Sequence, residues 1–455
     1  MASRLILEKI QLKTLQKYHH QNINCFGEHE TLVDAIKNRP GFLGANPVSY
    51  LSLLARRPNM QLADLDEALI IDRSLLRASA FRGSLFLLPS EDYGNYYRTF
   101  HQYLLKRGMQ KLLAHQINEI KLNRFAEILN NAISDLPVTI PKILELLFPG
   151  RKGRPSDEVC YHIIQKLCDL GVIVRATAKG WKGNDFTYAL FKKWIPDVSL
   201  SADNPETART ETIRKYLRCY GPASLEDIVW WTGLSMQQCQ RSIGNLRREA
   251  VRFHVESYKD DMIGLKESIE LIRKKSPIFE EVQLLPPWDP YTFGWRCQKR
   301  LADKEILPFI YDSFGNATSV IMDIGKAIGL WQFKDSDVNI IEFHIFSQYT
   351  HRKRYALQKI ETWANSLAKV TGSIGANIIE VPLPDISLKT RKVGSFLWPL
   401  GKRKIKSDKA YTTSPVERRT SNTFRKSYLD NDYLVRPNMS LQETRESEGI
   451  LDQGF

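Results

Sequence analysis

Residues 211–265, ETIRKYLRCYGPASLEDIVWWTGLSMQQCQRSIGNLRREAVRFHVESYKDDMIGL, decide the fold that we expect for this chain. Apolar side chains recur at helical spacing from Ile213 to Tyr220, and this first helix ends at Gly221-Pro222. Ser224 is a typical N-cap and begins a second helix that ends at Gly233. The stretch therefore starts with two short helices in succession.

A third helix and a β-hairpin complete the stretch. Ser235 caps the third helix, and residues 251–263 predict two short strands joined by polar residues. Helix, helix, turn, helix and hairpin is the order of elements in a winged helix. Three arginines are distributed around the third helix: Arg241, Arg247 and Arg248. They suit a recognition helix that faces phosphates, and a basic solvated helix face is the alternative.

Length and charge limit the class of protein. A chain of 455 residues is long enough for roughly three domains, each with a core of its own. Its formal net charge of +14 favours a polyanionic partner such as nucleic acid or an anionic surface. The charge indicates a partner and leaves the fold open.

The cysteines and the N-terminus indicate a reduced, intracellular protein. The six cysteines form no CxxC pair and have no histidine at metal-ligand spacing, so we expect no metal and no small-molecule cofactor. The first residues lack the apolar core of a secretory signal, and no apolar run approaches the ~20 residues that span a bilayer. We expect a cytoplasmic monomer, associated with the nucleoid if bacterial, and no membrane partner.

Two earlier parts of the chain repeat the helix-plus-hairpin order. In the first, Asn46-Pro47 marks the start of a helix, and residues 77–89 predict two strands that turn at Arg82-Gly83. In the second, a long helix over residues 91–113 connects to three more helices and to a hairpin over residues 172–190. The sequence thus predicts three tandem units.

The second unit contains a compact cationic loop. Arg151, Lys152 and Arg154 lie just before the third helix of this unit. Such a loop could grip phosphate, and a solvated surface loop is the other interpretation. Phosphate contacts there would provide affinity without sequence readout.

The last part of the chain predicts a β-rich domain and a tail. Short apolar runs such as residues 284–295 and ILPFIY at 306–311 predict strands, followed by a helix over residues 353–367. Beyond Pro399 the chain is polar and without periodicity, which predicts a disordered basic tail. The expected fold is α+β, with tandem winged-helix domains over 1–90, 91–200 and 201–276, a β-rich C-terminal domain over 277–399, and the tail over 400–455.

Four sequence blocks resemble a known family. The blocks are FRGSLFLLP at 81–89, YGPASLEDIVWWTGL at 220–234, LLPPWDPYTFGWR at 284–296 and VIMDIGKAIGLW at 320–331. In this order they resemble the AlkZ-like winged-helix DNA glycosylases. The resemblance implies three winged helices and a β domain that curve around duplex DNA, with no metal or organic cofactor. It also implies hydrolysis of the N-glycosidic bond of alkylated bases, in some members within interstrand crosslinks.

The chain departs from the family at the catalytic motif. Family enzymes carry Gln-x-Gln or Gln-x-Asp just before a helix, and the corresponding stretch here is similar only in position: Leu43-Gly44-Ala45-Asn46-Pro47. Hydrolysis needs one group that orients or deprotonates water and another that stabilises an oxocarbenium-like transition state. Asn46 is the one amide left and is our first catalytic candidate. Its other interpretation is a simple helix-start residue before proline.

Further candidates come from the resembling blocks. Arg82 occupies a family-typical position and could face DNA, or it could bond backbone carbonyls to hold its hairpin. Asp289 could act as a base or electrostatic stabiliser, or it could form an Asp-Pro turn and a structural ion pair, as could Arg296. The DNA-binding candidates are together Arg82, Arg151, Lys152, Arg154, Arg241, Arg247, Arg248 and Arg296.

Three functional hypotheses follow. The first is a duplex-DNA-binding protein of the AlkZ-like type without assured chemistry. The second is an active variant glycosylase that uses Asn46 and Asp289. The third is a transcription regulator that reads a groove with its winged helices, although no dimerisation helix is evident.

Overall fold

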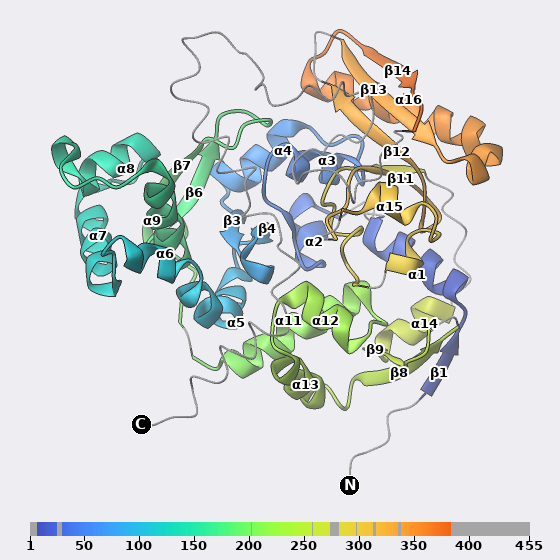
Figure 1. The fold of residues 1–455 in the computed structure, drawn as a ribbon, viewed down its shortest axis with the longest axis horizontal. Coiled ribbons are helices and arrows are strands. Elements are labelled where there is room, and N and C mark those ends of the chain that lie inside the picture. Colours follow the sequence, from blue (N-terminus) through green and yellow to red (C-terminus); the bar gives the residue numbers. More distant parts are fainter. Residues whose placement is uncertain are drawn as a thin grey trace.

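The computed structural model has the mixed α+β fold predicted from the sequence (Figure 1). No helix in the part that it describes is long and apolar enough to cross a membrane. The predicted tail over 400–455 lies outside the described residues. These are 7–24, 30–201, 203–256, 258–273, 282–296, 298–312, 315–334 and 338–383.

The first part of the chain builds helices around a hairpin. Strands β3 and β4 pair through a turn at residues 81–83, as predicted, and β2 adds to β4. The elements are α2 (Leu32–Lys37), β2 (Phe42–Leu43), α3 (Val48–Leu54), α4 (Leu62–Asp66), the π-helix η1 (Glu67–Ile71), β3 (Leu75–Ser79), the 3-10 helix η2 (Phe81–Gly83) and β4 (Leu85–Pro89).

The second part joins the first through a shared sheet. Arg77 in β3 pairs with Arg175 in β6, which gives a six-stranded sheet with the order β2-β4-β3-β6-β7-β5. The prediction of one helix over residues 91–113 is wrong, because Gly108 has φ 67° and separates α5 from α6. The elements are α5 (Tyr93–Lys106), α6 (Met109–Ala114), α7 (Glu119–Ala132), β5 (Val138–Thr139), α8 (Ile140–Leu147), the 3-10 helix η3 (Pro149–Arg151), α9 (Asp157–Asp169), β6 (Ile173–Ala178), β7 (Phe186–Leu190) and α10 (Phe191–Trp194).

The third part confirms the two predicted N-caps and the predicted ends of the first two helices. Ser224 and Ser235 each form a capping box, and Gly233 adopts the left-handed conformation (φ 71°) at the end of α12. The N-terminal strand β1 pairs in parallel with β8, and Leu15 and Tyr18 of α1 pack in a core with residues of this part. The elements are β1 (Leu7–Ile10), α1 (Leu12–Asn24), α11 (Pro205–Tyr220), α12 (Leu225–Thr232), α13 (Met236–Asn245), β8 (Ala250–Val255), β9 (Met262–Leu265) and α14 (Glu267–Arg273).

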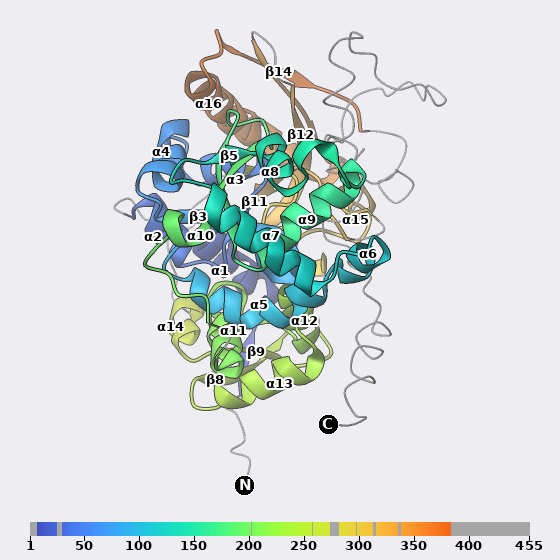
Figure 2. The ribbon, with the colours of Figure 1, turned by 90° about the vertical axis from the view of Figure 1, so that its left-hand side faces the viewer.

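The C-terminal part is a five-stranded sheet covered by α16, with the strand order β10-β11-β12-β13-β14. It lies at the opposite end of the molecule from α13 and β8 (Figures 1 and 2). The predicted strand at ILPFIY is wrong: residues 307–310 form α15, whose proline stands in its first turn, where no donor is needed. The elements are β10 (Gln283–Leu285), the 3-10 helix η4 (Gln298–Arg300), α15 (Leu307–Ile310), β11 (Val320–Asp323), β12 (Lys326–Lys334), β13 (Asn339–Ile345), the 3-10 helix η5 (Ser347–Arg352), α16 (Lys353–Thr371) and β14 (Ala376–Glu380).

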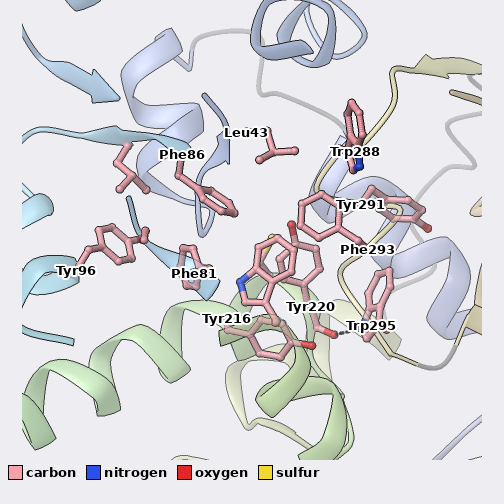
Figure 3. Packing of buried hydrophobic residues seen from close by; sticks show 14 of the residues in the cluster. Leu43, Phe81, Phe86, Tyr96, Tyr216, Tyr220, Trp288, Tyr291, Phe293 and Trp295 are labelled. Carbon is pink, nitrogen blue, oxygen red and sulfur yellow. Dashed lines mark hydrogen bonds between the residues drawn. The ribbon is translucent and has the colours of Figure 1, made fainter. Parts of the chain in front are cut away.

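Aromatic side chains join three parts of the chain in one core. The ring of Trp231 in α12 stacks on Phe293 of the C-terminal part, with 4.9 Å between ring centroids. On another side it contacts Phe81 of the first part at 5.6 Å. Figure 3 shows Phe81, Phe86 and Phe293 converging on this core. The positions of the three parts are therefore coupled by apolar packing.

His19 of α1 is buried at the edge of this core. Its Nε2 donates a hydrogen bond to the carbonyl of Gly221 (3.0 Å), and its ring lies 4.7 Å from that of Trp295. Burial lowers the pKa of His19 well below its ordinary value, and the charge of Arg300 acts in the same direction. The folded protein consequently holds His19 neutral.

We predict a pH-dependent loss of stability from His19. In the unfolded chain the imidazole titrates near its ordinary pKa of about 6.5. Below that pH the unfolded state binds a proton that the folded state does not, so the free energy of unfolding falls as the pH drops below about 6.5. Urea denaturation from pH 7.5 to 5 should give a shallower pH dependence for His19→Gln than for the wild type. His351→Gln, at an exposed position, is the control and should match the wild type.

Candidate functional site

The stretch Leu43–Pro47, here called the motif loop, connects β2 to α3. Leu43 is 3% exposed, and Figure 3 shows it near Phe86 and Trp288. Gly44 donates its backbone N–H to the carbonyl of Leu85, and a Cβ atom added there would lie only 3.0–3.1 Å from residues 85 and 86. Position 44 has no room for a longer side chain and position 47 is proline, so within this loop a pair of polar side chains two residues apart could stand only at positions 43 and 45.

Asn46 is buried, and its side chain is bonded at both ends. Its Nδ2 donates to the carbonyls of Gly183 (2.9 Å) and Gly180 (3.2 Å). Its Oδ1 accepts from Ser49 Oγ (3.0 Å) and from Arg77 Nη2 (3.1 Å). These bonds are the kind that fix a buried amide in one orientation.

The tip of the β6–β7 hairpin, residues 179–184, covers the motif loop. The side chain of Asn184 accepts from the backbone N–H of Asn46 and donates to its carbonyl, each at 2.8 Å. Trp181 in the tip lies between Tyr50 of α3 and Phe333 of β12, with ring centroids 6.3 and 6.1 Å away. The hairpin of the second part is thus anchored on the first part and reaches the C-terminal sheet.

A buried cation lies behind the motif loop. Arg77 is 2% exposed and donates from Nε to the carbonyl of Gly44 (3.0 Å), in addition to its bond with Asn46. Its guanidinium also lies over the ring of Phe186, 5.5 Å from the centroid. The loop therefore sits next to a positive charge in a region of low dielectric constant.

Asp289 forms a buried ion pair with Arg56. Both side chains are fully buried, and the two carboxylate oxygens accept from Nη1 and Nη2 at 2.7 Å each. The backbone N–H of Tyr291 also donates to this carboxylate (3.0 Å). No hydrogen bond or ion pair among the described residues joins Asp289 to Asn46. Their shared catalytic role stays a prediction, and the contacts of Asp289 match the structural alternative.

Arg56 and Arg77 were missed by the sequence reasoning. Arg56 lies in the turn just after α3, four residues after Ser52, and donates to the carbonyl of Ser52 (2.8 Å), so it continues the buried side of that helix. A charged residue at that helical spacing from an apolar face was the available signal. The sequence around Arg77 contains no such signal, because the residues that it bonds lie on a loop 31 to 33 residues earlier.

Arg82 stacks on aromatic rings. Its guanidinium lies 4.6 Å from the centroid of Trp230 and 5.8 Å from that of Phe293. Nε and Nη1 are buried without a hydrogen-bond partner among the described residues, and burial lowers the pKa of Arg82 to about 9. The proposed structural alternative, a bond to hairpin carbonyls, is instead made by Arg107, which donates to the carbonyl of Gly83. Whether Arg82 faces DNA stays a prediction.

The other basic candidates differ in exposure. Arg154 is tied to Asp157 in the first turn of α9 (2.5 Å), whereas its neighbours in the predicted cationic loop are exposed. Arg296 is exposed, and its backbone N–H donates to Asp227 (2.7 Å). The exposed candidates are Arg151, Lys152, Arg241, Arg247, Arg248 and Arg296.

One feature of the third helix differs from the prediction. Helix α13 ends at Asn245, so Arg247 and Arg248 lie in the turn before β8, while Arg241 is on the helix. Gly244 and Asn245 come just before this end, and neither favours a longer helix.

The described residues contain no group of three or more His, Cys, Asp or Glu that could hold a metal ion.

We predict that breaking the Arg56–Asp289 pair destabilises the protein. Asp289→Asn leaves the guanidinium buried without a counter-charge, which costs about 3–5 kcal/mol in comparable pairs. The free energy of unfolding, measured by urea denaturation, should fall by that amount. Lys142→Met removes an exposed ion pair to Glu145 and should change it by less than about 1 kcal/mol. Equal effects of the two variants would contradict the structural role of the pair.

Comparisons with known proteins agree on one family. A family model described as DNA glycosylase AlkZ-like matches residues 43–369. The interstrand DNA cross-link repair glycosylase of Streptomyces sahachiroi is 21% identical over 318 residues, which cover 67% of this chain and 81% of that protein. The structure of the Streptomyces sahachiroi DNA glycosylase AlkZ covers 82% of this chain and 100% of its own, with a TM-score of 0.66 and 18% identity, a likeness of fold. The family model spans well over half of the sequence, and this chain belongs to the AlkZ-like family of DNA glycosylases.

Proposed function

We propose that this protein binds duplex DNA with alkylated or crosslinked bases and that its motif loop does not hydrolyse the N-glycosidic bond. The substrate class comes from the Streptomyces sahachiroi relative, which is named an interstrand DNA cross-link repair glycosylase. The observation that carries the second half is the state of Asn46. Its amide is bonded to the β6–β7 hairpin, to Ser49 and to Arg77, so it has no group left to hold an attacking water.

The chemistry of the loop supports this assignment. Leu43 offers a buried apolar side chain, and Ala45 offers a methyl group. The positive charge of Arg77, bonded to the loop, opposes the cation that develops on the sugar during hydrolysis. Asp289, the other catalytic candidate, already neutralises Arg56. Neither a water-activating group nor a cation-stabilising group is free among these side chains.

We further propose that the three helix-plus-hairpin units are winged helices, within the boundaries predicted above except that β1 and α1 belong with the third unit, and that the protein acts as a monomer. The order of helices and strands in each part supports this layout. Affinity for DNA would come mainly from phosphate contacts by exposed basic side chains, those of Arg151, Lys152, Arg241, Arg247, Arg248 and Arg296.

The first experiment measures release of modified bases and binding on the same alkylated and crosslinked duplexes. We predict that the wild type binds these duplexes and releases no more base than a no-protein control, because the loop lacks both groups that hydrolysis needs. A glycosylase active on the same duplex serves as the positive control.

Base release above background would contradict the second half of the proposal. In that case Asn46→Ala tests the predicted catalytic amide, and Asp289→Ala is scored together with its folded fraction and DNA binding, because it also breaks the buried pair with Arg56. If no base is released, Leu43→Gln/Ala45→Gln tests whether an alternating glutamine pair, placed on either side of the crowded Gly44, gives the loop activity.

Salt dependence tests the first half of the proposal. We predict that affinity for duplex DNA falls about tenfold or more between roughly 50 and 200 mM monovalent salt, because contacts with even two phosphates give a log–log slope of about −1.8. Fluorescence anisotropy of a labelled duplex, titrated at four or more salt concentrations, measures this slope. An affinity that does not change with salt would exclude a phosphate-based interface.

A further inference from the structure

Helix α13 presents a continuous polar face to solvent. Its exposed residues follow one side of the helix at spacings of three and four, and the opposite side is buried through Cys239 and Ser242. In Figures 1 and 2 the helix runs along the lower edge of the molecule, away from the C-terminal sheet. The residues of this α13 face are Gln237, Gln240, Arg241 and Gly244; Asn245, the last residue of the helix, is also exposed, and its Nδ2 donates to Glu206 (3.1 Å).

The α13 face is chemically open. The side chains of Gln237 and Gln240 have no hydrogen-bond partner within the part of the chain that the structure describes. A Cβ atom added at Gly244 would meet nothing within 4 Å. The face itself carries no carboxylate. Arg241 forms an ion pair with Glu206 of α11, with 3.9 Å between Nη1 and Oε2, and both side chains are about half exposed. Such an exposed ion pair is weak, so another anion can readily replace Glu206 as the partner of Arg241.

The corresponding helices of the other two parts have different surfaces. In the first part, α4 and the π-helix η1 that follows it expose Asp64 and Glu67, and these acidic side chains would repel phosphate. In the second part, α9 is buried along most of its length, from Val159 to Asp169 with His162 half-buried, because it packs against β3, β6 and α5. Of these three helices, α13 is the one whose exposed face could approach an anionic partner closely.

We propose that α13 is the groove-reading helix of this protein and enters the major groove of duplex DNA. This inference rests on the proposed DNA binding. Glutamine can bond bidentately to the N6 and N7 atoms of adenine, and arginine to the O6 and N7 atoms of guanine. Gln237, Gln240 and Arg241 lie in the first two turns of α13, the part of a recognition helix that contacts base edges. Arg247 and Arg248, exposed just past its end, are placed for the flanking phosphates.

Two double variants of the full chain separate base contacts from phosphate contacts. Gln237→Ala/Gln240→Ala keeps the net charge; we expect about tenfold weaker binding of an undamaged duplex with an unchanged salt slope. Arg247→Ala/Arg248→Ala should reduce the magnitude of the slope by about 1.8. The matched control is Gln110→Ala/Gln358→Ala, which removes two exposed glutamines from α6 and α16 and should bind like the wild type.

Modified bases test whether the contacts lie in the major groove. Replacement of adenine by 7-deazaadenine removes the N7 acceptor that the glutamines would use, keeps the guanine N7 for Arg241, and leaves base pairing intact. It should weaken binding by the wild type several-fold and leave the weaker binding of Gln237→Ala/Gln240→Ala unchanged. Equal sensitivity of both proteins, or an unaltered affinity of the glutamine variant, would overturn the assignment of α13.

A crosslinking experiment locates the helix directly. A photo-crosslinking phenylalanine analogue at Gln240 should attach to bound duplex, whereas the same analogue at Asp64 in the first part should not. If the wild type binds duplex but the protein with the analogue at position 240 gives no crosslink, the α13 inference is refuted and the proposed function is not. A wild type that does not bind duplex refutes the proposed function, and the inference fails with it.

Discussion

The buried ion pair between Arg56 and Asp289 fixes how the C-terminal part meets the helix that follows the motif loop. Two fully buried charges are stable together because both guanidinium–carboxylate hydrogen bonds are short and the carboxylate also accepts a hydrogen bond from the backbone N–H of Tyr291. The pair is bidentate, so it sets orientation as well as distance. Apolar packing around Trp231 supplies stabilisation, and the ion pair supplies the geometry.

The sequence predicted the features that local chemistry determines. Ser224, Ser235 and Gly233 were placed correctly, because a cap or a left-handed end depends on residues within four positions. Gly108 and the ILPFIY segment were misjudged for a related reason: the apolar pattern continues through both, while a glycine in the left-handed region and a proline in a first turn determine the backbone. Periodicity alone does not register either effect.

The candidate site was harder to predict, because its contacts connect distant residues. Asn46 meets Asn184 across 138 positions, and Arg56 meets Asp289 across 233. Residue types and the family resemblance identified Asn46 and Asp289 as candidates, but the hairpin tip that bonds the Asn46 amide nitrogen and the Arg56 that bonds Asp289 both come from other parts of the chain. The repeated order of helices and strands also did not predict how exposed each unit is. The sheet shared through Arg77 and Arg175 buries α9, so the three units present different surfaces.

The two anchors of the hairpin tip respond differently to sequence change. Among the described residues, the side chain of Asn184 bonds only to the backbone of residue 46, so this contact does not depend on which side chain stands at position 46. The bonds to the carbonyls of Gly180 and Gly183 require the amide of Asn46 itself. Substitution at position 46 would consequently loosen the tip in a graded way and leave it attached, whereas substitution at position 184 removes the sequence-independent anchor. The contact therefore tolerates a change of side chain at position 46 better than a change at position 184.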